Sequence, residues 1–265
     1  MSRPENELTI AAGPPKKLVR RRVAVLDSLR GATLVSMVLY HACWDLVYLF
    51  GVNWSWYRSH GAFVWQQSIC WTFILLSGFC WPLSRQPLRR GAVTFGCGLV
   101  VTAVTLVFSP QSRVVFGVLT LLGSCMMLQA LLQQLCERVP AGLGLGLSLA
   151  LFAATRWVNR GYLWFGALGN AALPQTLYQG LGATYLGFTD PTFYSSDYFS
   201  LLPWYFLFAA GYYAHRLWFR TLRKSPLAAV RPPGLDWLGR HSLVVYMLHK
   251  PLIFALLTGW DRFLR

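Results

Sequence analysis

The chain has 265 residues, of which 55% are hydrophobic and only 12% are charged. A soluble domain carries about twice that charged share, and so few charges cannot give a core of this length a polar surface. The composition therefore argues against a water-soluble globule, an intrinsically disordered chain and a fibrous repeat. Apolar runs of roughly twenty residues recur along the sequence, as a polytopic membrane protein requires.

The formal net charge is +15, from 24 Lys and Arg against 9 Asp and Glu. In a membrane protein, positively charged cytoplasmic loops and anionic lipid headgroups account for such an excess before nucleic acid does. We therefore expect membrane lipids as partners and no nucleic acid.

Residues 1–22 are polar and end in a basic cluster. They predict a cytoplasmic tail leading into an uncleaved anchor, because the apolar segment that follows is too long for a cleavable signal. We expect 23–265 to form a single transmembrane domain.

Hydropathy predicts seven membrane spans, each a helix, because a helix satisfies its own backbone polar groups in hydrocarbon. The expected fold class is all-α, a polytopic transmembrane helical bundle. Residues 161–200 are apolar but interrupted by Gly and Pro, so they form either a re-entrant or interfacial segment or an eighth span. The predicted spans are 29–50, 62–81, 91–109, 114–135, 140–157, 201–218 and 238–260.

The distribution of Lys and Arg between these spans predicts the orientation. With the N-terminus inside, fifteen fall on the cytoplasmic side and six on the outer side. The positive-inside rule then favours a cytoplasmic N-terminus and an outer C-terminus, in the inner membrane of a cell.

Span one contains His41 and Asp45, two ionisable groups that are costly inside a membrane. Their i,i+4 spacing places them on one helix face, where a carboxylate can hold an imidazole in one tautomer and make it a general base. Two other interpretations stay open: a polar pair that joins neighbouring helices, and metal ligation. No third ligand at helical spacing supports a metal, so none is expected.

Span seven contains His249 and Lys250, followed by Pro251. His41 and His249 each lie about 17–18 Å along their span at 1.5 Å per residue, and both spans start on the same side. We expect the two histidines at similar depth, where they can face one cavity.

Polar side chains also mark both edges of the predicted membrane. Asp27, Arg30 and Arg240 lie at the cytoplasmic edge, where an arginine either binds a phosphate or pairs with a carboxylate. His60 and Asp197 lie in predicted outer segments, where each either contacts a sugar-like substrate or is simply solvated.

Five stretches in chain order form a familiar pattern. They are 22–45, beginning RVAVLDSLRG, 73–78 (FILLSG), 116–123 (FGVLTLLG), 197–204 (DYFSLLPW) and 238–251 (LGRHSLVVYMLHKP). Together they resemble the transmembrane acyltransferase superfamily, in particular the bacterial relatives of heparan-alpha-glucosaminide N-acetyltransferase. The resemblance covers 22–254 and is weakest over 140–196.

The resemblance implies an acyl-CoA donor, typically acetyl-CoA, bound on the cytoplasmic side. It implies donor contacts for Arg30 and Arg240, with Asp27 and Ser242 beside them. Relatives often carry a His where this chain has Thr120, so one donor or catalytic contact of the family is missing here.

For the reaction itself, the resemblance implies His41 as general base or transient acyl carrier, Asp45 as the group that orients it, and His249 as support for the acyl or leaving group. The acceptor is typically an amine or hydroxyl of a sugar or envelope glycan on the outer side. The candidate acceptor contacts are His60, Asp197 and Trp204.

The sequence thus predicts an inner-membrane acyltransferase, with an oligomer allowed. One rival is a proton-coupled transporter of small solutes that uses the same His and Asp groups as a relay. The sequence lacks the paired, broken halves common in such transporters. A second rival is a membrane scaffold that keeps the fold without the chemistry.

Overall fold

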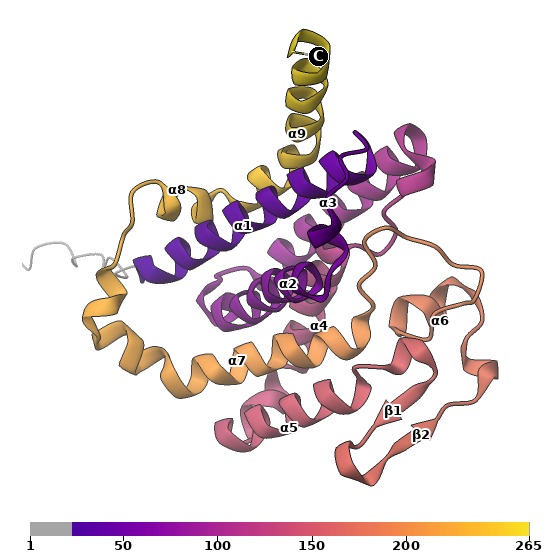
Figure 1. The fold of residues 1–265 in the computed structure, drawn as a ribbon. Helices are drawn as coiled ribbons and strands as arrows, with labels where there is room; N and C mark the ends of the chain where they lie inside the picture. Colours follow the sequence, from indigo (N-terminus) through magenta and orange to yellow (C-terminus); the bar gives the residue numbers. More distant parts are fainter. Residues whose placement is uncertain (1–22, 265) are drawn as a thin grey trace, which may run out of the picture.

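The computed structural model describes residues 23–264, and the predicted cytoplasmic tail 1–22 lies outside the described residues. Seven long helices overlap the seven predicted spans (Figure 1), which confirms the all-α membrane bundle. They are α1 (Ala24–Tyr48), α2 (His60–Cys80), α3 (Pro87–Phe108), α4 (Val118–Arg138), α5 (Ala141–Thr155), α7 (Leu201–Lys224) and α9 (Ser242–Leu264).

Five stretches are both long and apolar enough to cross a membrane: His60–Leu83, Pro87–Phe108, Val118–Arg138, Ala141–Arg160 and Ser242–Trp260. Helices α1 and α7 are equally long but more polar. The reason in α1 is the set of ionisable groups that the sequence singled out, from Arg30 near its start to Asp45 near its end. Their cost in lipid is offset only if neighbouring helices bury and partner them.

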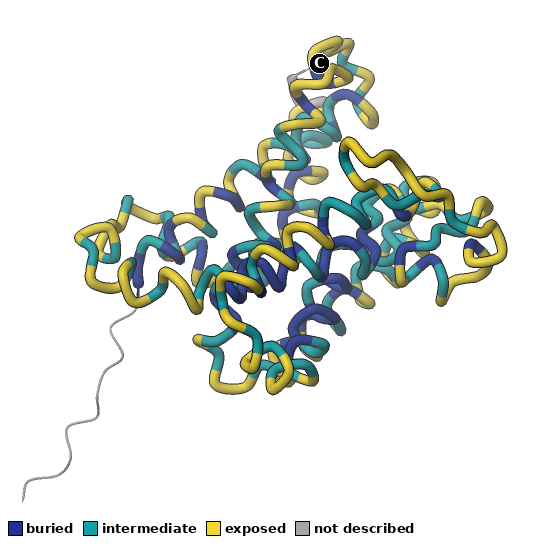
Figure 2. Tube along the Cα trace, turned by 90° about the horizontal axis from the view of Figure 1, so that it is seen from below, coloured by how far each residue is buried: buried dark blue, intermediate teal, exposed yellow. Residues whose placement is uncertain are grey.

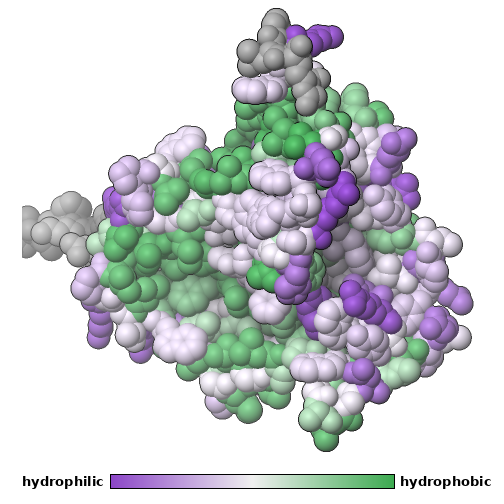
Figure 3. All heavy atoms as spheres, in the orientation of Figure 1, coloured by the Kyte–Doolittle hydropathy of each residue, from purple (hydrophilic) through white to green (hydrophobic). Residues whose placement is uncertain are grey.

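Figure 2 shows exposed positions along the helices. Many of the exposed side chains are large and apolar, among them Phe108, 80% exposed, and Leu131, 74% exposed. Figure 3 shows apolar side chains gathered over the helices, with hydrophilic ones more frequent toward the β1–β2 side of this face. A contiguous apolar surface of this kind requires an apolar surrounding, which for a bundle of spanning helices is the lipid bilayer.

Residues 161–200 contain no helix longer than seven residues. Strand β1 (Tyr162–Trp164) pairs antiparallel with β2 (Asn170–Ala172), Tyr162 lying opposite Ala172. A short helix, α6 (Gly180–Leu186), follows. Of the two alternatives for this segment, the structure therefore favours an interfacial segment over an eighth span.

The last predicted span is divided in two. Helix α8 (Leu235–Arg240) ends at Arg240 and is followed by His241, and α9 begins at Ser242. Helix α8 packs closely on α1, because a Cβ on Gly31 would overlap the backbone of Leu235 and a Cβ on Gly239 would overlap that of Asp27. Small residues allow helix backbones to approach in membranes, and here they fix the start of α9 beside Arg30.

The main core lies where α2, α4, α5 and α7 meet. Helices α2 and α7 cross at Gly78 and Gly211, each too close to the partner backbone for a side chain. Phe208 and Leu121 are among the buried apolar residues that fill this core. Helix α9 lies at the edge, packs mainly on α1, and beyond Pro251 extends away from the other helices (Figure 1).

Candidate active site

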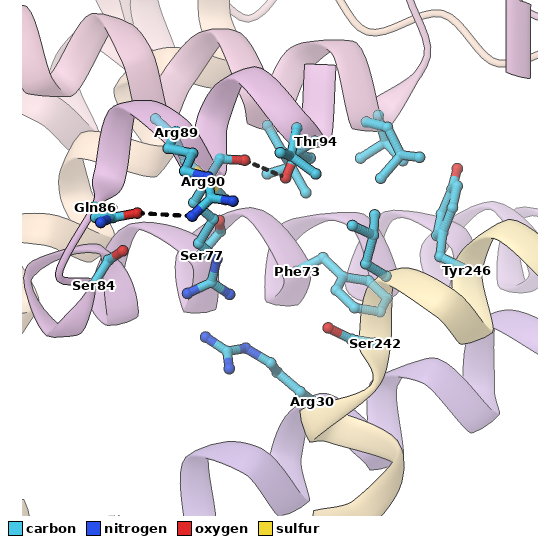
Figure 4. Close-up of a pocket in the computed structure, with 16 residues that line it drawn as sticks. Arg30, Phe73, Ser77, Ser84, Gln86, Arg89, Arg90, Thr94, Ser242 and Tyr246 are labelled. Carbon is cyan, nitrogen blue, oxygen red and sulfur yellow. Dashed lines mark hydrogen bonds between the residues drawn. The ribbon is translucent and has the colours of Figure 1, made fainter. Parts of the chain in front are cut away.

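Two cavities in the described part of the chain form the candidate site. The larger of the two has a volume of about 400 Å³ and lies between α1, α2, α3, α4 and α9. Arg30, Arg89 and Arg90 gather at one end of it, while Phe73 and Tyr246 lie toward the other (Figure 4). Its lining includes no carboxylate. The arrangement combines a cationic end with an apolar interior, which suits a ligand with phosphates at one end.

The arginines come from segments distant in sequence. Arg30 lies in the second turn of α1 and pairs with Asp27, whose carboxylate Oδ1 is 3.4 Å from Arg30 Nη1. Arg89 and Arg90 lie in the first turn of α3, whose start at Pro87 suits the fixed backbone angle of proline. Arg89 also donates a hydrogen bond to Gln86 at 3.3 Å.

The smaller cavity has a volume of about 50 Å³. His41 and Tyr40 of α1, Gln66 of α2 and Asp197 of the loop before α7 supply its polar lining. Three side chains line both cavities and so lie between them: Phe73, Val118 and Tyr246. The histidine of span one and the aspartate of the 161–200 segment therefore share a cavity directly next to the arginine-lined one.

His41 lies beside His249, with ring centroids 4.9 Å apart. The sequence predicted that these residues face one cavity. The structure brings the rings together, but only His41 lines the smaller cavity, and His249 lies behind it and lines neither cavity. His249 Nδ1 lies 2.5 Å from the carbonyl oxygen of Tyr246. A carbonyl only accepts, so Nδ1 carries the proton and Nε2 has the free lone pair. Within the described residues, His249 Nε2 and His41 Nδ1 are buried without a hydrogen-bond partner.

Asp45 does not form the expected contact with His41. Its carboxylate Oδ1 lies 2.5 Å from Lys250 Nζ, which also lies 4.4 Å from the centre of the Trp44 ring. The i,i+4 spacing placed Asp45 within reach of His41, but the amine on α9 is the stronger partner for a carboxylate. The hypothesis that Asp45 orients His41 is therefore not supported by any contact in the structure.

Asp197 faces the smaller cavity and the start of α4. Its carboxylate accepts a hydrogen bond from the backbone N–H of Val118, a position where the helix dipole favours negative charge. Burial nevertheless raises the pKa of Asp197 to about 6, because desolvation disfavours the charged form more than this hydrogen bond and the distant Lys250 charge favour it.

Six of the predicted site residues line neither cavity: Asp27, Asp45 and His249, described above, and Arg240, His60 and Trp204. Arg240 is exposed and pairs with Asp236 on the same helix, 3.2 Å between Nη2 and Oδ2. His60 is exposed at the start of α2. Trp204 is 6% exposed in the main core, with the guanidinium of Arg156 over its ring at 4.9 Å. Only Ser242, of the predicted donor contacts besides Arg30, lines the larger cavity.

Two groups were missed as site residues. Arg89 and Arg90 entered only the count of cytoplasmic charges, and Tyr246 entered only as part of a motif. The available signal was the adjacency of two arginines at the start of a span that follows Pro87. Within residues 23–264, no group of three or more His, Cys, Asp or Glu is placed to hold a metal ion.

The structure is a helical membrane bundle in which two histidines, one buried and one partly buried, lie in contact next to a cationic cavity. These features define a class, the membrane proteins with a polar reaction or transport site inside the membrane. A family comparison narrows it: the model described as heparan-alpha-glucosaminide N-acetyltransferase, catalytic, matches residues 22–251. The chain belongs to this family of membrane acetyltransferases. The comparisons with curated proteins and with solved structures give no match.

Proposed function

We propose that the protein transfers an acetyl group from acetyl-CoA, bound in the larger cavity, to an amine or hydroxyl of a sugar or envelope glycan that enters from the opposite side. The observation that carries the proposal is the adjacency of the two cavities through Phe73, Val118 and Tyr246. We further propose that the membrane is the cytoplasmic one and that the N-terminus of the chain is cytoplasmic.

The larger cavity suits the donor. Arginine pairs with phosphate through charge-assisted, often bidentate hydrogen bonds, and CoA carries several phosphates on a long, flexible arm. Arg30, Arg89 and Arg90 would hold the phosphates, while the arm would pass Phe73 toward the smaller cavity. The volume of about 400 Å³ lies within the usual range of ligand pockets.

The histidine pair supplies the proton transfer. His249 Nε2 accepts the proton of the acceptor amine or hydroxyl as that group attacks the thioester carbon. The C–S bond breaks, and the CoA thiolate takes the proton back from the imidazolium. In the alternative two-step route, His41 attacks first, releases CoA and passes the acetyl group to the acceptor.

Asp197 would face the acceptor. Its carboxylate lines the smaller cavity from the 187–200 loop, whereas the three arginines line only the larger one. A carboxylate there pairs with an ammonium group, as on an amino sugar, and accepts hydrogen bonds from sugar hydroxyls. It would bind the acceptor before its proton is lost to the histidine pair.

The test is acetyl transfer by the purified chain in proteoliposomes, with labelled acetyl-CoA and amino-sugar acceptors. We expect transfer by the wild-type chain, a loss of about 10²–10⁴ in kcat by His249→Ala and, on the two-step route, no transfer by His41→Ala, with expression and thermal stability largely kept. Transfer by His41→Ala at the wild-type rate would remove His41 from the mechanism. Solute uptake without any acyl donor would instead support the transporter alternative.

A further inference from the structure

An ion pair joins α1 to α9 next to the histidine pair. Asp45 is 1% exposed at its side chain and meets Lys250, whose side chain is 40% exposed. The two other ion pairs of the described residues, Arg30–Asp27 and Arg240–Asp236, each lie within one helix. Lys250–Asp45 is therefore the one ion pair in the described part of the chain that holds two helices together.

The Lys250–Asp45 pair lies next to the point where the backbone hydrogen bonding of α9 is interrupted. Pro251, the next residue, has no N–H, so α9 loses the backbone hydrogen bond to the carbonyl of Met247. Before this point α9 packs on α1 through apolar contacts, among them Val245 and Tyr246 with Leu34 and Met37. The C-terminal part of α9 extends away from the bundle (Figure 1), where Leu256 and Trp260 are 73% and 63% exposed.

His249 depends on this attachment for its place. Its only hydrogen bond, from Nδ1 to the Tyr246 carbonyl, lies within α9 and sets the tautomer and the ring orientation on that helix. Nothing bonded to Nε2 holds the ring against His41. The distance between the two rings therefore follows from where α9 lies along α1, and the adjacent Lys250–Asp45 contact sets that position.

We propose that Asp45 and Lys250 are positioning residues that hold His249 against His41, and that neither touches the reacting groups. The inference rests on the proposed function and assigns Asp45 a different role from that of a carboxylate orienting His41. A buried carboxylate without its partner is strongly unfavourable. Loss of Lys250 therefore either shifts α9 or admits water beside Asp45. Either change moves α9 relative to α1 and so increases the distance between the two imidazoles.

The first experiment separates turnover from donor binding. We expect Lys250→Met to lower kcat on the order of 10- to 100-fold, since a displacement of about 1 Å costs that much. The KM for acetyl-CoA stays within about twofold, because the arginines lie elsewhere. Lys250→Arg keeps most of kcat. The matched control is Arg216→Met, which removes exposed hydrogen bonds from α7 to the backbone carbonyls of Cys136 and Val139 and leaves both constants unchanged.

The second experiment replaces the ion pair with an uncharged link. In a chain whose native cysteines are replaced, Asp45→Cys/Lys250→Cys is treated with a short bis-methanethiosulfonate reagent. We expect cross-linking to restore kcat and reduction to abolish it again, whereas each single cysteine gains nothing. A cross-linked protein that stays inactive shows that the charges themselves are needed, and the positioning role is then wrong.

The rate of cysteine labelling at position 249 does not depend on acetyl transfer, so it tests this inference separately from the proposed function. His249 is 6% exposed, so His249→Cys in the cysteine-replaced chain should react slowly with a maleimide. Adding Lys250→Met should speed this labelling several-fold. An unchanged labelling rate together with an unchanged kcat would overturn the inference. Absence of any acetyl transfer by the wild-type chain defeats the proposed function, while the labelling result still decides the position of His249.

Discussion

The two cavities differ in how their polar groups are partnered. In the larger one, Arg30 and Arg89 bond to neighbours within three residues on the chain, Asp27 and Gln86. In the smaller one and beside it, His41 and His249 come from opposite ends of the chain and keep buried nitrogens without partners. Buried polar atoms are normally satisfied. We propose that a substrate completes the bonding of these two imidazoles, which adjoin a cavity, whereas the other unpartnered atoms of the described residues, such as Gln129 Nε2 and His215 Nδ1, line neither cavity.

On this contrast we base the proposal that the larger cavity binds the donor and that the reaction takes place at the smaller one. Mutations in the two should then affect different kinetic constants. The expected effects below run from the largest to the smallest, and each tests whether binding and reaction are separate.

The largest effect is expected at His249. Replacement by Ala removes the imidazole whose tautomer is fixed and should lower kcat by about 10²–10⁴, the usual contribution of a general base. The KM for acetyl-CoA should stay close to wild type. Steady-state kinetics in proteoliposomes measures both constants. A large rise in KM with little change in kcat would place His249 in donor binding and contradict the separation of binding and reaction between the two cavities.

The arginines should show the opposite pattern. Replacing Arg89 and Arg90 together by Gln removes two charge-assisted contacts, each worth about 1.5–3 kcal/mol, and should raise the KM for acetyl-CoA by at least tenfold. The value of kcat at saturation should change little. Donor binding measured by calorimetry checks this directly, with Arg85→Gln in the same α2–α3 connection as a control outside the cavity. Unaltered donor binding would contradict the assignment.

Phe73 should limit the size of the acyl group, because it separates the cavities and the smaller one holds only about 50 Å³. One water molecule needs roughly 10–15 Å³ of cavity volume, so there is room for the acetyl group and the reacting amine or hydroxyl of the acceptor, but not for a longer acyl chain or the rest of a sugar. Phe73→Ala should improve use of butyryl-CoA relative to acetyl-CoA about tenfold. Leu122→Ala, which widens only the larger cavity, is the control. A wild-type chain that uses both donors equally would contradict the limit.

The smallest effect concerns Asp197. With its pKa raised to about 6 by burial, the side chain is a carboxylate above that pH and a neutral acid below it. Binding of an ammonium acceptor should therefore weaken several-fold as the pH falls from 7 to 5. Asp197→Asn should weaken binding at pH 7 and abolish this dependence. Acceptor KM measured across the range is the check, and a pH dependence that persists in Asp197→Asn would exclude this residue as its source.

The same raised pKa has a consequence for stability. The folded chain holds the Asp197 proton more tightly than the unfolded chain, whose Asp titrates near 3.9. Ionisation of Asp197 therefore lowers the free energy of unfolding as the pH rises from about 4 to about 6. Asp197→Asn should remove this part of the pH dependence of thermal stability.

The sequence by itself determined the helices, the membrane and the family. Spans of apolar residues require helices in lipid whatever their neighbours do, and the ionisable groups inside them, His41 and His249, stood out because lipid makes them costly. Their expected common depth follows from the rise per residue of a helix, which is a local property.

Only the tertiary structure decided the partners. Asp45 is one turn from His41 in sequence, yet it bonds to Lys250, 205 residues further along. Arg89 and Arg90 meet Arg30 because of how α1 and α3 lie around one cavity, and Trp204 falls in the core while Asp197 reaches a cavity. Helical spacing fixes which side chains share a face, but the direction of that face is set by packing between helices far apart in the chain.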